Sequence, residues 1–166
     1  MIELCTVPAS GNSVLLAMAR ELVGEYAVMP HTIPRWPKAA ADIAALPQPF
    51  VAPRGLLLVA KSGSEPVGCG ALLAYDPPVI AEIKRVYVRP SARGQGAGEL
   101  IMRALLSEAS TRGFTRVRLD TAPELLAAQA LYLRLGFIQI PQYGSDQLPG
   151  DVCFECDLTT YQREAR

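Results

Sequence analysis

Residues 86–98 run from an apolar strand through a basic, glycine-rich turn into a helix. This stretch reads VYVRPSARGQGAG and has glycine at positions 94, 96 and 98. Glycine lacks the Cβ that would hold an anion away from the backbone, and the first N–H groups of a helix have no intrahelical partner. Those donors and the positive end of the helix dipole favour a phosphate. The stretch therefore predicts a pyrophosphate-binding turn.

Hydrophobic periodicity around this turn predicts a mixed α/β sheet covered on both faces, with one crossover connection at the turn itself. The predicted strands are Glu3–Val7, Leu56–Lys61, Val67–Tyr75, Ala81–Val88, Arg116–Asp120, Phe137–Ile140 and Val152–Leu158, the last two as neighbours. Four helices are predicted. The first follows a cap at Ser10 or Asn12, and the second begins at Pro37. The third spans Ala97–Thr111 with Leu100 on its buried face, and the fourth runs from a capping box at Thr121 to Leu135.

The length of 166 residues, half of them hydrophobic, predicts one domain over residues 1–166 with a frayed tail at 159–166. Sixteen basic and sixteen acidic side chains cancel, so we expect neither nucleic acid nor an anionic membrane as a partner. Any basic function must be local, as at Arg89 and Arg93.

The first residues lack the pattern of a signal peptide, and no apolar run is long enough to span a membrane, so we expect a soluble, cytoplasmic protein.

The cysteines lie in apolar, strand-like segments, which is typical of reduced, buried thiols. They are Cys5, Cys69, Cys153 and Cys156. The CxxC spacing of the last two invites a metal or redox interpretation, but there is no second pair and His31 is the sole histidine. We expect no metal.

Two other nucleotide sites are alternatives for the glycine turn. A Walker phosphate loop requires Lys-Ser or Lys-Thr after its last glycine, whereas Glu99 follows Gly98. A dinucleotide or S-adenosylmethionine site is a closer alternative, because Asp120 ends the next strand at about the position of a ribose-binding acid. However, the turn begins at Arg89, well before the glycines, and residues 121–166 are too few to complete a doubly wound sheet.

Arg93-x-x-Gly96-x-Gly98 resembles the signature of the GNAT superfamily of acyl-CoA-dependent N-acetyltransferases. The preceding strand, Glu82–Val88, resembles the strand that leads into that signature, and Ala130–Phe137 resembles the family's second motif. The resemblance implies a mostly antiparallel sheet of six to seven strands with helices on both faces and a splayed parallel pair, Ala81–Val88 and Arg116–Asp120.

The family binds acetyl-CoA across that splayed pair, so the resemblance implies acetyl-CoA as the acyl donor. The pantetheine arm would pair with the first strand, and the pyrophosphate would take N–H groups from the turn. The residues so assigned to acetyl-CoA are Val86, Tyr87, Val88, Arg93, Gly94, Gln95, Gly96, Ala97 and Gly98.

Two catalytic candidates follow from the resemblance. Tyr132 is at the position of a tyrosine that faces the CoA sulfur, where it would protonate the leaving thiolate or hold the sulfur in place; the alternative is a buried core tyrosine. Glu82 is at the spacing at which some family members have a general-base glutamate. Such a base is needed because an ammonium must lose a proton before its nitrogen can attack. The alternative is a carboxylate paired with Lys84. Leu125 replaces an asparagine that many relatives have, so no side-chain contact to acetyl-CoA is expected there.

The candidates for binding the acceptor are Tyr26, His31, Arg35, Trp36, Tyr75 and Tyr143, each with a structural alternative in the core or on the surface. We expect an N-acetyltransferase that acts on a primary amine of a small or amino-acid-like acceptor, by direct attack on acetyl-CoA in a ternary complex and as a monomer or homodimer. A backbone N–H near Val86–Val88 would stabilise the developing oxyanion. The alternatives are a non-catalytic acyl-CoA-binding domain and acetylation of a protein amine.

Overall fold

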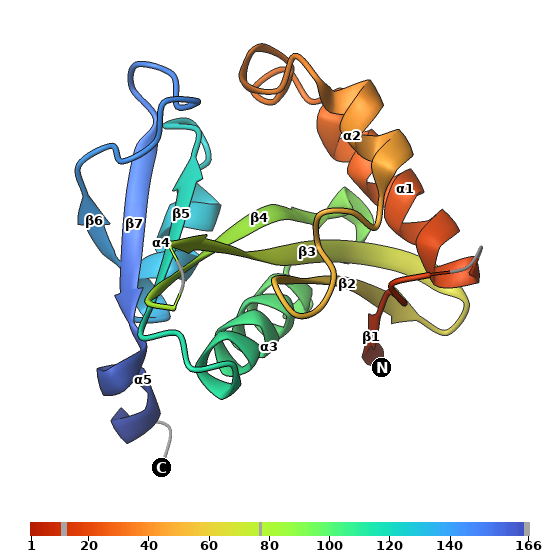
Figure 1. Ribbon diagram of the computed structural model, residues 1–166. Helices are drawn as coiled ribbons and strands as arrows, with labels where there is room; N and C mark the ends of the chain where they lie inside the picture. The colour runs from red at the N-terminus through yellow and green to blue at the C-terminus, as the bar shows by residue number, and fades with distance from the viewer. Residues whose placement is uncertain (11–12, 77, 165–166) are drawn as a thin grey trace. The chain divides into compact units, whose positions relative to one another are not determined.

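The computed structural model describes residues 1–10, 13–76 and 78–164 (Figure 1). These residues form a mixed α/β structure of seven strands and five α-helices. In chain order the elements are β1 (Ile2–Thr6), α1 (Val14–Ala27), the 3₁₀ helix η1 (Ile33–Arg35), α2 (Ala39–Ala45), β2 (Gly55–Ser62), β3 (Glu65–Asp76), β4 (Ile80–Val88), the 3₁₀ helix η2 (Pro90–Ala92), α3 (Ala97–Thr111), β5 (Arg116–Thr121), α4 (Leu126–Arg134), β6 (Ile138–Ile140), β7 (Val152–Asp157) and α5 (Leu158–Glu164).

The strands are hydrogen-bonded in the order β1-β2-β3-β4-β5-β7-β6. Neighbours run antiparallel in the pairs β1–β2, β2–β3, β5–β7 and β6–β7. β4 and β5 are parallel, and the last pair of their short ladder joins Glu82 to Arg118. The predicted mostly antiparallel sheet with one parallel pair is therefore confirmed, as is the prediction that the last two strands are neighbours.

The chain contains two compact units. Unit 1 consists of residues 1–73 and 83–105, and unit 2 of residues 74–82 and 106–166. Unit 1 contains β1, β2, α1, α2 and the glycine turn, whereas unit 2 contains β5, β6, β7, α4 and α5. β3, β4 and α3 contribute residues to both units. The single domain expected from the chain length stays a prediction.

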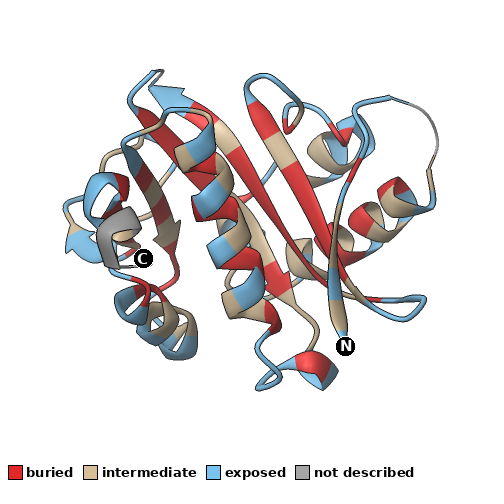
Figure 2. Ribbon diagram, turned by 90° about the horizontal axis from the view of Figure 1, so that it is seen from below, coloured by how far each residue is buried: buried red, intermediate tan, exposed pale blue. Residues whose placement is uncertain are grey.

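In unit 1, α1 and α2 cover one face of the strands and α3 lies against the other (Figure 1). On the α1 face, Leu22 and Val23 are fully buried in the same core as Leu57 of β2. On the α3 face, a Cβ at Gly70 would lie 2.6 Å from the side chain of Ile101, so the glycine lets the helix pack close to β3. Figure 2 shows strands in the middle of the view buried over most of their length, while buried and exposed residues alternate along the helices.

In unit 2, β5 pairs with β7 and β6 pairs with β7. α4 contributes Tyr132, whose ring centroid lies 5.9 Å from that of Phe137 and 5.7 Å from that of Phe154. Both phenylalanines are 2% exposed, so these three rings belong to the interior of the unit. Aromatic pairs at these separations stabilise a core beyond the area that they bury.

Helix starts differ from the sequence predictions in three places. α2 begins at Ala39 and not at Pro37. α1 is capped by Ser13, whose side chain accepts a hydrogen bond from the Leu16 N–H at 3.1 Å, and not by Ser10. The other predicted cap, Asn12, lies outside the described residues. The capping box at Thr121 does not form, because Thr121 is the last residue of β5 and pairs with Val152; α4 instead begins five residues later without a side-chain cap.

Two further predictions about helices need correction. Leu100, expected on the buried face of α3, is 40% exposed, while Met102 and Leu106 are fully buried. Where a frayed tail is predicted after Leu158, the chain forms α5. The Asp157 carboxylate begins this helix by accepting hydrogen bonds from the backbone N–H and the hydroxyl of Thr159, at 2.8 and 2.7 Å.

Candidate functional site

The glycine turn of unit 1 connects the end of β4 to the start of α3. After η2, Gly94 and Gly96 adopt φ angles of 75° and 83°. This left-handed backbone is readily available to glycine and strained for residues with a side chain. Gly98 already lies inside α3 and has no positive φ. Two of the three predicted glycines therefore shape the turn, and the third opens the helix.

The turn also presents backbone donors. The N–H of Leu100 bonds to the carbonyl of Gly96 at 3.0 Å, which makes Gly96 the N-cap of the 15-residue helix α3. The three N–H groups between these residues precede that bond and have no acceptor within the helix. A Cβ added at Gly94 or Gly96 would have none of the described atoms within 4 Å, so the space beside the turn is open. Open space and donors at a helix N-terminus fit a pyrophosphate.

The two arginines near the turn are engaged differently. Arg89 contacts the Glu25 carboxylate at 2.7 Å and also pairs with Glu21. Hydrogen bonds to Glu25 raise the pKa of Arg89 above its usual range, and those from Arg89 lower the pKa of Glu25. Arg93, closer to the glycines, donates from Nε to the carbonyl of Val88 at 3.1 Å. Arg89 therefore fixes the end of β4 to α1, and Arg93 is the cation better placed for an anion at the turn.

Gly96→Leu should weaken CoA binding more than it weakens folding. The side chain would have to adopt the left-handed conformation, which costs about 1–2 kcal/mol, and it would project into the open space expected to hold the pyrophosphate. We expect a loss of roughly 10-fold or more in CoA affinity by isothermal titration calorimetry, since at least one charge-assisted hydrogen bond worth about 1.5–3 kcal/mol is prevented.

Gly113→Leu is the matched control for this change. Gly113, just beyond the other end of α3, has a φ of 87°, and a Cβ added there would likewise have none of the described atoms within 4 Å. Both variants should lose similar thermal stability, but Gly113→Leu should bind CoA as the unchanged protein does. Equal losses of affinity in the two variants would contradict a phosphate-binding role for the turn.

Tyr87 and Arg85, on β4, both face α1 and α2. The Tyr87 hydroxyl donates to Glu25 at 3.1 Å, and burial raises the pKa of this tyrosine. Its side chain is therefore part of the support beneath the strand. Arg85 has a φ of 58°, a conformation that a non-glycine residue rarely adopts, and its carbonyl accepts a hydrogen bond from the Cys69 thiol at 3.3 Å.

The Arg85 guanidinium lies 3.5 Å from the centre of the Trp36 ring. It is also 3.9 Å from the carboxylate of Asp42, and that carboxylate accepts a hydrogen bond from the Trp36 indole N–H at 2.6 Å. Neither Arg85 nor Asp42 stands out in the sequence. No spacing rule brings a strand residue to a loop tryptophan and a helix aspartate, so only the fold reveals this cluster.

Three residues predicted to bind the acceptor lie together in unit 1. The ring of Tyr26 is 6.4 Å from His31 and 6.3 Å from Trp36, measured between centroids, and it is 6.2 Å from Tyr87. Arg35, a fourth candidate in unit 1, donates to the carbonyl of His31. Tyr75 and Tyr143 belong to unit 2 and have different partners. The predicted set therefore divides into a cluster beside α1 and a pair of tyrosines in unit 2.

Tyr143 binds Glu82, the predicted general base. The Tyr143 hydroxyl donates to the Glu82 carboxylate at 2.7 Å, and Glu82 is 5% exposed. Burial, followed by the charge of Glu82, raises the pKa of Tyr143 well above its usual range. The hydroxyl consequently keeps its proton at neutral pH and remains a donor to the carboxylate.

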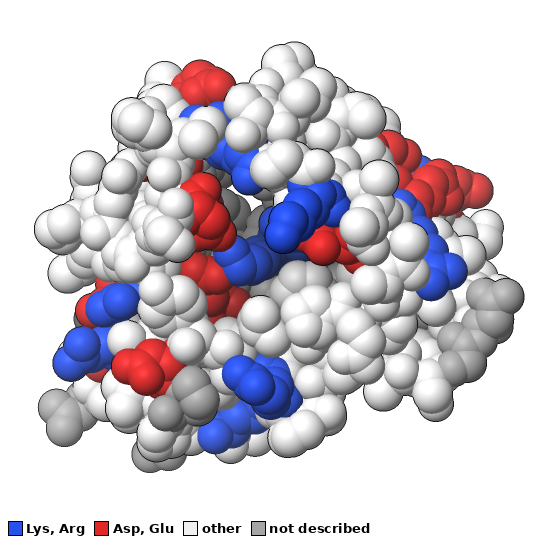
Figure 3. Space-filling model, turned by 45° about the horizontal axis from the view of Figure 1, so that its top comes forward, with Lys and Arg blue, Asp and Glu red and all other residues white. Residues whose placement is uncertain are grey.

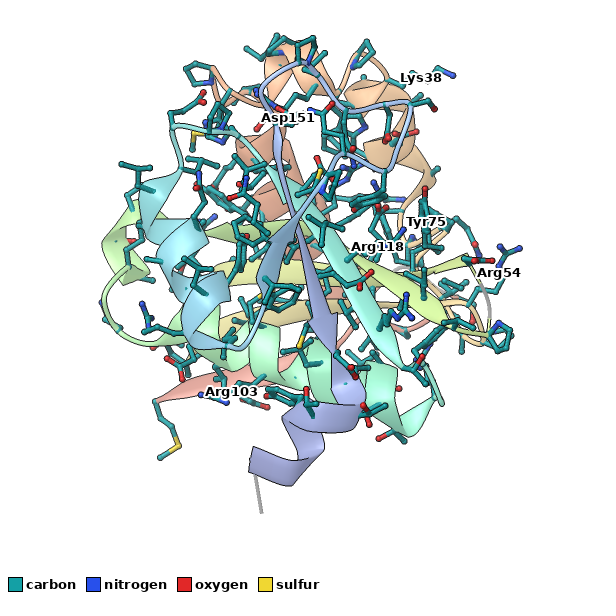
Figure 4. All side chains as sticks on the ribbon, turned by 90° about the vertical axis from the view of Figure 1, so that its left-hand side faces the viewer. Lys38, Arg54, Tyr75, Arg103, Arg118 and Asp151 are labelled. Atoms are coloured by element: carbon teal, nitrogen blue, oxygen red, sulfur yellow. The ribbon has the colours of Figure 1, made fainter. Side chains whose placement is uncertain are left out.

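Two neighbours hold Tyr143 in place, and both are labelled in Figure 4. Tyr75 lies edge-on to its ring with centroids 5.3 Å apart and donates its hydroxyl to the Tyr143 carbonyl at 3.2 Å. The guanidinium of Arg118, which also bonds Glu155 at 2.7 Å, lies 5.1 Å from the ring of Tyr143. Both the backbone and the ring of Tyr143 are therefore fixed where its hydroxyl meets Glu82.

Tyr132 is 6% exposed, with the ring neighbours described above. Its burial fits both of the alternatives left by the sequence, a core tyrosine and a hydroxyl directed at a bound thioester.

The thiols do not form a paired site. Cys153 and Cys156 lie three residues apart on β7, so their side chains point to opposite faces of the sheet. Both are unbonded by disulfides and buried, and burial raises the pKa of Cys153 to about 11. Burial likewise raises the pKa of Cys69 to about 12, which leaves it protonated and a poor nucleophile.

The surface in Figure 3 carries basic and acidic side chains next to one another. Such mixing agrees with a formal net charge of zero. Among the helices that the structure describes, none is both long and apolar enough to cross a membrane.

The chain is similar in sequence to known acetyltransferases. The family model described as the acetyltransferase (GNAT) family matches residues 17–137. An N-acetyltransferase of Schizosaccharomyces pombe, named as uncharacterised, is 32% identical over 108 residues, which are 64% of this chain and 66% of the relative. The IAA acetyltransferase of Azospirillum brasilense is 33% identical over 94 residues, 55% of this chain and 61% of the relative. The matched segments thus span less than two thirds of these relatives.

The fold is similar to that of a GNAT-family acetyltransferase from Staphylococcus aureus, with a TM-score of 0.76 over 95% of this chain and 99% of that one. The identity between the two sequences is 16%, so this similarity concerns the fold.

Proposed function

The chain belongs to the acetyltransferase (GNAT) family, and from that membership we propose that it transfers an acetyl group from acetyl-CoA to a primary amine of a small or amino-acid-like acceptor. The observation that carries the proposal is the open turn before α3, where two left-handed glycines and the helix N-terminus fit a pyrophosphate. When bound, acetyl-CoA supplies an acetyl group activated as a thioester.

The residues that would bind the donor belong to unit 1. The turn from Arg93 to Gly98 would hold the pyrophosphate, and the backbone of Val86–Val88 would pair with the pantetheine arm as an added strand does. One N–H of the same segment would donate to the acetyl oxygen, where negative charge develops during attack.

Proton transfer would fall to a carboxylate and a hydroxyl side chain. An alkyl ammonium has no lone pair, so Glu82 would accept its proton, directly or through water, before the nitrogen attacks. The hydroxyl of Tyr143 would hold the Glu82 carboxylate during that step. The new C–N bond forms as the C–S bond breaks, and the departing thiolate would take a proton from Tyr132 or be held by it. No covalent acetyl-enzyme is needed.

Release of the CoA thiol from acetyl-CoA tests the proposal directly. With a panel of primary amines, at least one acceptor should release thiol and yield the N-acetylated product by mass spectrometry. Tight CoA binding without turnover on any small or peptide amine would instead indicate a non-catalytic acyl-CoA-binding domain. Turnover with peptide amines alone would make the acceptor a protein.

A further inference from the structure

Residues 141–151 connect β6 to β7 without forming a helix or a strand. Such connections are usually the more mobile parts of a fold. Here, however, side chains tie the segment to itself. The Gln142 amide donates to the carbonyl of Leu148 at 2.8 Å, and the buried carboxylate of Asp151, labelled in Figure 4, accepts from the Leu148 N–H at 2.9 Å. The segment that carries Tyr143 is therefore cross-linked by hydrogen bonds.

The side chain of Gln147 forms a further tie, directly to the backbone of Tyr143. Its Oε1 accepts hydrogen bonds from the N–H groups of Tyr143 and Gly144, both at 3.0 Å. These N–H groups belong to the two peptide units on either side of the Tyr143 Cα. The Tyr75 hydroxyl binds the carbonyl of the second unit. Because a residue has only two soft backbone dihedrals, one between its Cα and each of these units, Gln147 restrains both of them at Tyr143.

The backbone of Tyr143 decides where its hydroxyl lies. The phenol is a rigid ring that ends in the hydroxyl, so a rotation at the Cα displaces that group more than the rest of the side chain. The hydroxyl donates to the Glu82 carboxylate at 2.7 Å, and groups at a functional site must stay within about 0.5 Å and 10–20° of their productive geometry. Since Gln147, Tyr143 and Glu82 all belong to unit 2, a change at Gln147 can reach Glu82 through Tyr143.

We infer that Gln147 is a positioning residue, which directs the Tyr143 hydroxyl to the carboxylate that takes the proton of the acceptor amine. This inference rests on the proposed function, because that function gives the Glu82 carboxylate its task. Gln147 acts through Tyr143, so its effect on turnover requires the Tyr143 hydroxyl.

Substitutions of Gln147 test whether its acceptor oxygen matters for turnover. Gln147→Met keeps the length of the side chain without the acceptor, and it should lower kcat by about 5- to 10-fold, up to the loss expected for Tyr143→Phe, with the KM for acetyl-CoA unchanged. Gln147→Glu retains an oxygen at this position and should recover most of that loss. Gln129→Met is the matched control, because the Gln129 amide also binds two backbone groups of unit 2, the carbonyls of Ala122 and Pro123. It should lower thermal stability and leave kcat unchanged.

A double-mutant cycle tests whether Gln147 acts through Tyr143. In the Tyr143→Phe background, Gln147→Met should reduce kcat by less than about twofold more, because residues that act on one another are not additive. The same fold loss in both backgrounds would overturn the inference, since Gln147 would then affect turnover without the hydroxyl. If Gln147→Met does not fold, Gln147→Asn, whose amide is one methylene shorter, replaces it under the same criterion.

The pKa of Tyr143 provides a measurement that does not depend on turnover. Burial, followed by the charge of Glu82, raises this pKa above its usual range, so a hydroxyl released from its site should ionise closer to the ordinary value of about 10. The NMR signal of the Tyr143 Cζ, assigned by its loss in Tyr143→Phe, should titrate at lower pH in Gln147→Met and not in Gln129→Met. An unchanged Tyr143 pKa in folded Gln147→Met would overturn the inference.

Thiol release separates this inference from the proposed function. Equal kcat in the unchanged protein and in Gln147→Met would overturn the positioning role and support the acetyltransferase. A lower Tyr143 pKa in Gln147→Met, without thiol release from any amine by the unchanged protein, would support the control of Tyr143 by Gln147 and overturn the acetyltransferase.

Discussion

Glu82→Gln should lower kcat by about 100-fold or more at neutral pH, which is the usual contribution of a general base. The amide can still accept the hydrogen bond that Tyr143 donates at 2.7 Å, so the buried site keeps its partner and the fold should persist. What the substitution removes is the capacity to take a proton from the acceptor ammonium. The measurement is thiol release at saturating acetyl-CoA, with CoA affinity and thermal unfolding recorded in parallel.

The pH dependence distinguishes loss of a base from structural damage. An alkyl amine such as that of lysine has a pKa of about 10.4, so solvent removes its proton as the pH rises toward that value. The deficit of Glu82→Gln should therefore narrow with increasing pH. A deficit that stays constant across the pH range would indicate that Glu82 supports the structure and does not accept the proton.

Glu155→Gln provides the matched control in unit 2. Glu155 is a half-buried carboxylate that pairs with Arg118 at 2.7 Å, so its loss tests the cost of removing a neighbouring ion pair. We expect lower stability with kcat within about threefold of the unchanged enzyme.

Tyr143→Phe removes the hydrogen bond to Glu82 and leaves the ring contacts with Tyr75. It should reduce kcat by an intermediate factor of about 10, in line with the loss of a charge-assisted hydrogen bond.

Local signals predict the glycine turn and the helix that follows it. The bounds of α3, Ala97–Thr111, agree with the prediction because periodic apolar residues and glycine punctuation act within a few positions of one another. The crossover between two parallel strands follows from the same stretch. A helix that begins directly after a strand can be recognised without knowledge of the rest of the chain.

Features that depend on distant partners could not be predicted in the same way. Thr121 has the local pattern of a helix cap, but its pairing with Val152 extends β5 through it and displaces the start of α4. Glu82 and Tyr143 are each candidates from the sequence, yet they are 61 positions apart and nothing in the sequence joins them. The same limit applies to Arg85, whose contact with Trp36 arises from the packing of β4 against the loop before α2.

Tyr132→Phe should lower kcat by about 100-fold, at the lower end of the range for general acids, with CoA affinity nearly unchanged. The lower end is expected because a thiolate is a good leaving group, with a thiol pKa of about 8.5 for a free cysteine, and needs less help from a proton than an amine or alkoxide does. The phenyl ring retains the packing against Phe137 and Phe154, so the interior of unit 2 loses no volume. The affected quantity should therefore be the chemical step and not the fold.

Three measurements on Tyr132→Phe decide between the two roles left open for this residue. A core role predicts an unchanged kcat. Removal of the buried hydroxyl would then lower only the free energy of unfolding. A role at the sulfur predicts reduced kcat at saturating acetyl-CoA, an unchanged Kd for CoA and little change in Tm. Because the ring is 6% exposed in either case, burial cannot distinguish these roles, and turnover measured beside Tm can.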